Sequence, residues 1–239
     1  MKPYQQDSIH ITYYANIYEQ MYDIPIYQNA AKGKSVLELA CGTGRVLNAL
    51  SSARSRVGID NSLKMLDVAR NGQKVELILG DILEPNIDQK FELVILALKT
   101  INMFDRAERL KILQNMAKLM EPKGWAMIHA SFWTENVTPP PSIKSWNTPN
   151  GTVTRTQVNS ITCKEQQTVE ATMVYELQDT NGSKTREEEN FKIYLPSQTQ
   201  FIEEATIAGL QVLGYYNLSS YERIALFKLH QGSDQQQAR

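Results

Sequence analysis

The fold of this chain is decided by the stretch Val36-Leu-Glu-Leu-Ala-Cys-Gly-Thr-Gly-Arg-Val-Leu-Asn-Ala-Leu50. Residues 36–40 form a short apolar run, which is typical of a parallel strand buried on both faces. Gly42 and Gly44 allow a tight turn that brings the backbone close to a ligand. The helix that begins near Arg45 would point free N–H groups at that ligand. We therefore expect a ligand at the carboxyl end of this strand, where open α/β sheets bind cofactors.

The spacing within this stretch distinguishes between two classes of cofactor. Glu38 stands four residues before Gly42, and the pattern E-x-A-x-G-x-G resembles motif I of the class I S-adenosylmethionine-dependent methyltransferases. A dinucleotide fingerprint would need a third glycine at the position of Leu47. A nicotinamide-dependent oxidoreductase on the same doubly wound fold stays open as an alternative, with the missing glycine against it.

Three later segments resemble further parts of this family. Arg56-Val-Gly-Ile-Asp60 resembles the second strand, which ends in the acid that takes the ribose hydroxyls. Val75-Glu-Leu-Ile-Leu-Gly-Asp81 resembles the third strand, which implies that its aspartate holds the adenine amino group and that Ile82 lies against the ring. Phe91-Glu-Leu-Val-Ile-Leu-Ala97 resembles the fourth strand, where Phe-Asp-x-Val is commoner. The order and spacing of these segments make the resemblance specific.

The resemblance implies a cofactor and a set of residues that bind it. The cofactor is S-adenosyl-L-methionine, and the product is S-adenosyl-L-homocysteine. No metal is expected, because the chain lacks the acid of the magnesium-dependent catechol O-methyltransferases. The implied cofactor-binding residues are Tyr14, Tyr18, Tyr22, Glu38, Ala40, Gly42, Gly44, Arg45, Asp60, Asn61, Met65, Asp81, Ile82 and Ala97.

The expected fold class is α/β, with a Rossmann-like seven-stranded methyltransferase sheet and a small antiparallel β insertion after the fifth strand. The expected strands of the first half lie at 36–40, 56–60, 75–79, 91–97 and 125–131, and the expected helices at 44–53, 62–71 and 104–120. A Pro-Lys-Gly turn closes the last of these helices before the fifth strand. A helix that starts at Ser197 and strands at 210–218 and 223–230 then complete the sheet.

A break in composition at Thr138-Pro-Pro-Pro-Ser142 precedes the insertion. From about residue 143 to 195 apolar and polar residues alternate, and a hairpin signal stands at Asp179-Thr-Asn-Gly-Ser183. The run Arg186-Glu-Glu-Glu189 suits a cationic substrate, but a solvated strand face is the commoner explanation. The implied division is a helical lid at 1–30, a cofactor-binding core at 31–137, a substrate-side insertion at 138–196, a completing segment at 197–230 and a disordered tail at 231–239.

The N-terminal region is rich in tyrosine. The pattern Tyr18-x-x-x-Tyr22-Asp23 places two rings on one face of a helix that we expect to end before Pro25. In small-molecule N-methyltransferases of the class, including those acting on glycine and on amino sugars, a similar helix closes over the cofactor. Electron-rich rings stabilise a sulfonium cation without attacking it, which makes Tyr18 a candidate catalytic residue. The alternative is an amphipathic lid whose rings pack on the edge of the domain.

The composition is that of an ordinary globular protein of 239 residues, 42% of them apolar. The net charge of −1 gives no electrostatic reason to bind nucleic acid or an anionic membrane. The two cysteines, Cys41 and Cys163, have no second ligand at metal spacing, and no stretch reaches the ~18 apolar residues of a membrane span. We expect a cytoplasmic protein that binds neither nucleic acid nor membrane, and the oligomeric state stays open.

The chemistry implied by the resemblance is an in-line displacement on an activated methyl group, which mainly requires alignment and desolvation. An amine must be neutral to attack, and His129 at the end of the fifth strand is the candidate base, although a satisfied core histidine is the commoner explanation. We expect methylation of a small molecule or short peptide, on nitrogen rather than oxygen. The alternatives are an O-methyltransferase for a small metabolite, the oxidoreductase, and a non-catalytic scaffold that retains the cofactor pocket.

Overall fold

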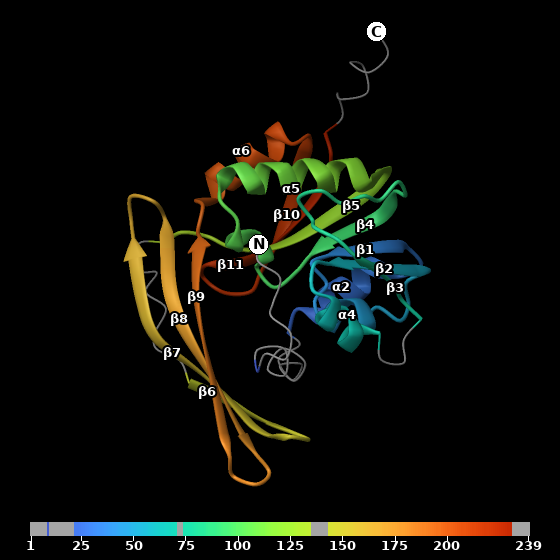
Figure 1. Ribbon diagram of the computed structural model, residues 1–239. Coiled ribbons are helices and arrows are strands. Elements are labelled where there is room, and N and C mark those ends of the chain that lie inside the picture. Colours follow the sequence, from blue (N-terminus) through green and yellow to red (C-terminus); the bar gives the residue numbers. More distant parts are fainter. Residues whose placement is uncertain (1–8, 10–21, 71–73, 135–142, 231–239) are drawn as a thin grey trace.

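The computed structural model describes residues 9, 22–70, 74–134 and 143–230. It contains two sheets: a central one in the core and an elongated one that stands beside the core (Figure 1). The strands of the central sheet follow the order β10-β11-β5-β4-β1-β2-β3. They are β1 (Ser35–Leu39), β2 (Ser55–Asp60), β3 (Glu76–Leu79), β4 (Phe91–Leu96), β5 (Met120–Ser131), β10 (Leu210–Asn217) and β11 (Glu222–Leu229).

The central sheet has the expected class I arrangement. Strands β3, β2, β1, β4 and β5 run parallel, whereas β11 pairs antiparallel with both β5 and β10. Strand β1 is buried along its whole length, because its short apolar run is covered on both faces. The chain leaves β1 toward β2 on one side and returns to β4 on the other. The carboxyl ends of β1 and β4 therefore form the switch point of the sheet, where open α/β sheets bind ligands.

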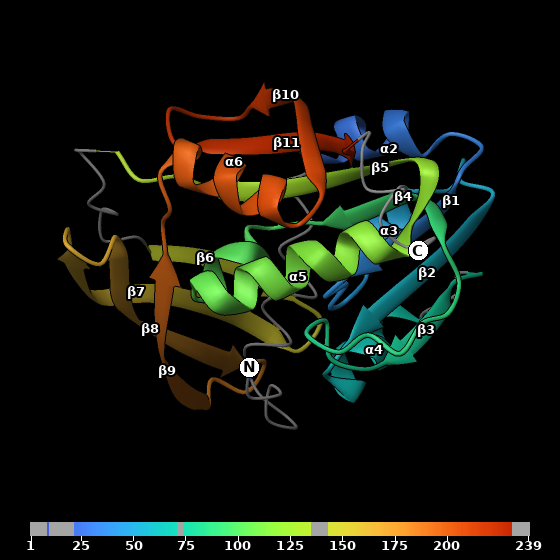
Figure 2. The same cartoon turned by 90° about the horizontal axis from the view of Figure 1, so that it is seen from above.

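Helices cover both faces of this sheet. They are α2 (Ile24–Ala31), α3 (Arg45–Ala49), α4 (Leu63–Ala69), α5 (Arg106–Leu119) and α6 (Gln198–Ile207), with a 3-10 helix η2 (Thr100–Met103) after β4. Helices α5 and α6 lie side by side over one face, and α2 lies on the other (Figures 1 and 2). Leu113 and Phe201 belong to the core under α5 and α6, whereas Tyr27 and Val46 belong to the core under α2 and α3.

The insertion after β5 is the second sheet. Its strands β6 (Ile143–Thr148), β7 (Gly151–Cys163), β8 (Thr168–Asp179) and β9 (Lys184–Tyr194) are all antiparallel and follow the order of the chain. Asn102 ties this sheet to the core, because its side-chain amide donates to the carbonyl of Ser131 at 2.8 Å and to that of Tyr194 at 2.7 Å. It also accepts from the backbone N–H of Ser131 at 2.8 Å, so one buried side chain holds the ends of β5 and β9 together.

Two prolines bear on the expected boundaries. Pro25 lies in the first turn of α2, where its missing N–H would have no partner within the helix. The helix that we expect to end before Pro25 lies mostly outside the described residues. Strand β5 starts at Met120 instead of after the Pro-Lys-Gly turn, since Met120 pairs with Phe91 and Trp125 with Leu93. The intervening residues form a bulge within the strand. The first two core helices are also shorter than expected, as the bounds of α3 and α4 show.

Candidate functional site

A pocket opens at the switch point of the central sheet, at the carboxyl ends of β1 and β4. Half of the residues that the sequence predicts for cofactor binding line it, and they come from three stretches of the chain, at 38–45, 60–65 and 97. These residues are Glu38, Ala40, Gly42, Arg45, Asp60, Met65 and Ala97. The fold therefore brings together residues that the sequence places far apart.

The glycine turn after β1 shapes the floor of this pocket. Gly42 has φ +53°, and a Cβ added there would meet no atom within 4 Å. Gly44 has φ +80°, but a Cβ there would come within 2.7 Å of the Asn48 side chain and 3.0 Å of Ala69. Gly42 thus leaves open space for a ligand beside the backbone, whereas Gly44 is needed for its conformation and for the packing of α3 on α4.

Asp60 braces the same turn from the end of β2. One carboxylate oxygen accepts from the backbone N–H of Gly42 at 2.8 Å, and the other accepts from that of Ser62 at 2.9 Å. The side chain is buried, and this desolvation raises its pKa in spite of the two hydrogen bonds. Asp60 also lines the pocket, so its carboxylate is placed to accept a hydrogen bond from a ligand hydroxyl.

The buried side chain of Glu38 binds the backbone of α3. Its carboxylate accepts from the backbone N–H of Leu47 at 2.8 Å. The expectation that the first N–H groups of this helix are free for a ligand is therefore wrong for Leu47, because a buried acid within the protein already takes it. Burial raises the pKa of Glu38 to about 8, although the nearby Arg45 and the Leu47 hydrogen bond oppose the shift.

Glu38→Gln should remove a pH dependence of stability. The folded protein holds the Glu38 proton more tightly than the unfolded chain, with a pKa of about 8 against an ordinary 4.5. Its stabilising contribution is complete below the unfolded pKa and is lost as the pH rises through the folded one. The melting temperature of the variant minus that of the parent should therefore increase as the pH rises from about 5 to about 9. A difference in melting temperature that is the same at every pH would contradict the raised pKa of Glu38.

Arg45 reaches away from the turn toward the start of α2. Its guanidinium forms two hydrogen bonds to the carboxylate of Asp23, at 2.7 and 2.6 Å, and both side chains are buried. Asp23 precedes α2 but makes no side-chain cap to it, because the carboxylate is committed to Arg45. Sequence analysis did not select Asp23 as a site residue. Its only signal in the sequence is that Asp23 stands just before the start of a helix, and an acid at that position is more often an N-cap.

Other predicted residues lie outside the lining of this pocket. Asp81 is exposed and accepts from the backbone N–H of Leu83 at 2.9 Å in a turn, followed by the buried Ile82. Asn61 follows Asp60 and is partly buried. Tyr22 is 54% exposed. Tyr14 and Tyr18 lie outside the described residues, so the structure does not place them.

His129 is buried on β5, on the sheet face that carries Met127 and Ile224. Neither of its ring nitrogens has a hydrogen-bond partner within the described part of the chain. Those described residues therefore supply no hydrogen bond of the kind that a satisfied core histidine would have. Burial lowers its pKa to about 4, and the positive charge of Lys99 adds to this effect. The imidazole is neutral at pH 7 and has a lone pair available to accept a proton.

The described residues show neither a metal site nor a membrane-spanning helix. Within residues 9, 22–70, 74–134 and 143–230, no group of histidine, cysteine, aspartate or glutamate side chains is arranged to hold a metal ion. Across the same residues, no helix has the length and apolar character that crossing a bilayer would require.

Comparisons with known proteins identify the segment around this pocket. Residues 36–124 match a family model described as a methyltransferase domain. The chain is 33% identical over 101 residues to the cypemycin N-terminal methyltransferase of Streptomyces sp, which covers 40% of this chain and 41% of that protein. It is 27% identical over 191 residues to a dTDP-3-amino-3,6-dideoxy-alpha-D-glucopyranose N,N-dimethyltransferase of Streptomyces fradiae, which covers 78% of this chain and 74% of that protein. The first match thus spans less than half of the relative's length.

The fold as a whole is also similar to that of solved structures. CalS10, an amino pentose methyltransferase from Micromonospora echinaspora solved with S-adenosylmethionine bound, superposes with a TM-score of 0.72 at 16% identity. The alignment covers 95% of this chain and 100% of that one, so it includes the inserted sheet. The family match at residues 36–124 favours methyl transfer over the oxidoreductase that the sequence had left open.

Proposed function

We propose that this chain is a class I S-adenosylmethionine-dependent methyltransferase that methylates an amine nitrogen of a small molecule or short peptide, which its methyltransferase domain and its fold support. The observation that carries the proposal is the pocket at the ends of β1 and β4, with open space beside Gly42. The relatives named above act on the N-terminus of a peptide and on the amine of a sugar nucleotide, which supports nitrogen as the acceptor.

The residues around the pocket fit S-adenosylmethionine, which supplies a methyl group on a sulfonium when it is bound. We assign the ribose hydroxyls to Asp60, whose buried carboxylate lines the pocket. Asp81 and Ile82 would hold the adenine, and the Gly42 backbone would lie against the amino-acid end of the cofactor. Burial of the Asp60 carboxylate strengthens its polar contacts.

His129 is the group that we propose to accept a proton from the amine. It lies on the same face of the sheet as Ala97, which lines the pocket. Its low pKa keeps the imidazole neutral at pH 7, so a ring nitrogen can accept the proton that the amine must lose before its lone pair attacks.

We assign acceptor selection to the inserted sheet and to the N-terminal segment before α2. Asn102 supports this assignment, because it joins η2, which starts beside the pocket, to the end of β9. A cytoplasmic location is part of the proposal, and it is supported by Cys41 and Cys163, which are both free thiols.

The first test is calorimetric titration with S-adenosylhomocysteine, which needs no knowledge of the acceptor. The parent should bind with micromolar affinity, about −8 kcal/mol. Asp60→Ala and Asp81→Ala should each weaken binding by about 1–3 kcal/mol through lost hydrogen bonds. Asp81 is exposed, so its variant should keep the melting temperature of the parent. Unchanged affinity in either variant would remove that residue from the site, and no binding by the parent at millimolar ligand would refute the cofactor.

The second test concerns the acceptor. The protein with S-adenosylmethionine is incubated with a dTDP-linked 3-amino sugar, with a peptide that has a free N-terminal amine, and with the hydroxyl analogue of each. Mass spectrometry should detect methylation of an amine and none of the matched hydroxyl compound. Methylation of the hydroxyl compounds alone would instead establish an O-methyltransferase.

A further inference from the structure

The start of β11 carries a carboxylate beside the candidate base. In the antiparallel pair of β5 and β11, Glu222 lies opposite Ser131, and Ile224 lies opposite His129. Side chains two residues apart on a strand point to the same face, so Glu222 and His129 share the face that α2 covers. Glu222 is mostly buried, with 12% of its side chain exposed.

The Glu222 carboxylate already holds an ammonium group. The Nζ atom of Lys99 lies 2.5 Å from its Oε1 atom, in a contact that spans 123 positions of the chain. Lys99 follows Leu98, which lines the pocket, and both have positive φ, at 61° and 52°. This uncommon backbone conformation turns the Lys99 side chain from the end of β4 toward β11.

The negative charge of Glu222 affects the pKa values of two neighbouring groups, Tyr22 and His129. After burial, Glu222 is the largest contributor to raising the pKa of Tyr22 to about 12. It also opposes the lowering of the His129 pKa, which burial and Lys99 produce. Tyr22, His129, Lys99 and Glu222 therefore form one electrostatic cluster beside the cofactor pocket.

Other carboxylates near this cluster are committed to fixed partners. Asp23 is bound through both oxygens to the buried guanidinium of Arg45. Glu38 and Asp60 accept from backbone N–H groups, which cannot move away. Lys99 differs from these partners, because its side chain is 38% exposed and its four-carbon stem can swing into solvent.

We propose that Glu222 binds the ammonium group of the methyl acceptor, and that Lys99 is an internal cation that occupies this carboxylate until the acceptor displaces it. This inference rests on the proposed function. An aliphatic amine is mostly protonated at pH 7, as lysine is with its pKa of about 10.4. The acceptor therefore arrives as the same chemical group that Glu222 binds in the structure. A hydroxyl acceptor has no charge with which to displace Lys99, so the pair selects for amines.

The test depends on two variants with opposite expected effects. Glu222→Gln removes the carboxylate, and it should raise the KM for the amine acceptor at least about tenfold with a smaller change in kcat. Lys99→Met removes the competing cation, and it should lower the same KM severalfold. The affinity for S-adenosylhomocysteine should stay at the parent value in both. The probes are the dTDP-linked amino sugar and the peptide amine of the acceptor test.

A matched control comes from an exposed ion pair that includes neither Glu222 nor Lys99, although its Glu84 belongs to the turn that begins at Asp81. Lys111 on α5 and Glu84 form a contact of 2.9 Å, and Lys111→Met and Glu84→Gln make the same chemical changes there. Both control variants should keep the KM of the parent. They show whether a change of one charge anywhere on the protein alters the KM.

The outcomes separate this inference from the function on which it rests. If the pair were only structural, both variants would break the same contact and would change the KM in the same direction, which would overturn the inference. An unchanged KM in Glu222→Gln, with amine methylation by the parent intact, would overturn it as well. If the parent methylates no amine at all, the proposed function fails and the inference fails with it.

Discussion

Arg45→Met is expected to lower the free energy of unfolding by about 3–5 kcal/mol, because it leaves a buried carboxylate without its counter-ion. Asp23 and Arg45 are bound through two hydrogen bonds of 2.7 and 2.6 Å, with side chains only 2% and 5% exposed. Arg45 directly follows the glycine turn and lines the pocket. The variant should therefore also weaken binding of S-adenosylhomocysteine, since the turn loses its tie to the start of α2.

Urea denaturation of Arg45→Met, Asp23→Asn and the double variant measures this effect. The double variant should be more stable than the sum of the single losses predicts, because removing both charges leaves neither one buried alone. Losses that simply add would show that the two residues do not act as a pair. A loss below about 1 kcal/mol, the value typical of exposed pairs, would contradict the burial that the structure shows.

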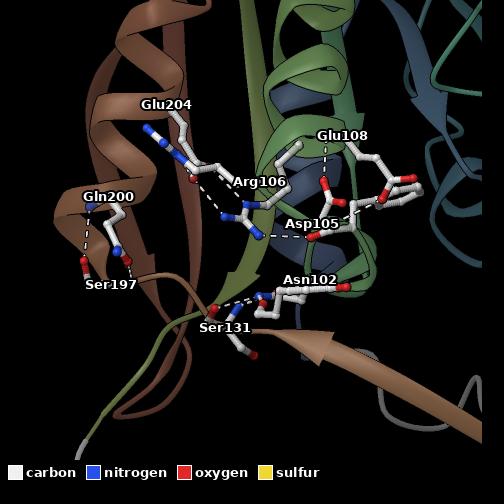
Figure 3. A network of polar contacts seen from close by, with 11 residues as sticks. Asn102, Asp105, Arg106, Glu108, Ser131, Ser197, Gln200 and Glu204 are labelled. Carbon is white, nitrogen blue, oxygen red and sulfur yellow. Dashed lines mark hydrogen bonds and ion pairs between the residues drawn. The ribbon is translucent and has the colours of Figure 1, made fainter. Parts of the chain in front are cut away.

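Arg109→Met is expected to cost about 3–5 kcal/mol of stability as well, but to leave the affinity for S-adenosylhomocysteine unchanged. Arg109 on α5 donates to both carboxylate oxygens of Glu204 on α6, at 2.9 and 2.8 Å, and both side chains are buried. It also donates to the carbonyl of Phe104 at 3.0 Å. Figure 3 shows the network around Glu204, and α5 and α6 cover the face of the sheet opposite to α2 (Figures 1 and 2). The pair joins the two covering helices without touching the pocket.

Arg106→Met is the control for this second prediction. The side chain of Arg106 is 72% exposed, and it reaches Glu204 only at 3.6 Å (Figure 3). Its loss should cost no more than about 1 kcal/mol. Because Arg106 stays near Glu204 in Arg109→Met, the cost of that variant should lie toward the lower end of its range. Urea denaturation and calorimetry on the same samples measure both quantities, and a change in cofactor affinity would show that α5 and α6 do influence the pocket.

The sequence by itself determined the fold class and the place of the pocket. The apolar run of β1, the glycines after it and the acid that ends β2 are local signals, because each depends on residues adjacent in the chain. Their order is enough to place a ligand at the carboxyl ends of β1 and β4, since parallel strands with crossover helices have few possible arrangements. The alternation of apolar and polar residues likewise identified the inserted sheet, in which Val153, Met173 and Tyr175 are buried together.

Only the tertiary structure decided which polar groups meet. The partners of Arg45, Glu38 and Lys99 lie 22, 9 and 123 positions away, and no local pattern indicates such pairs. The environment of His129, which has no hydrogen-bond partner among the described residues, has the same cause, because it is set by strands and a helix from distant parts of the chain. Backbone geometry follows from neighbouring residues, but desolvation and charge pairing depend on everything that packs around a group. The sequence could therefore locate the site, whereas its protonation states and its internal cation became visible only in the folded protein.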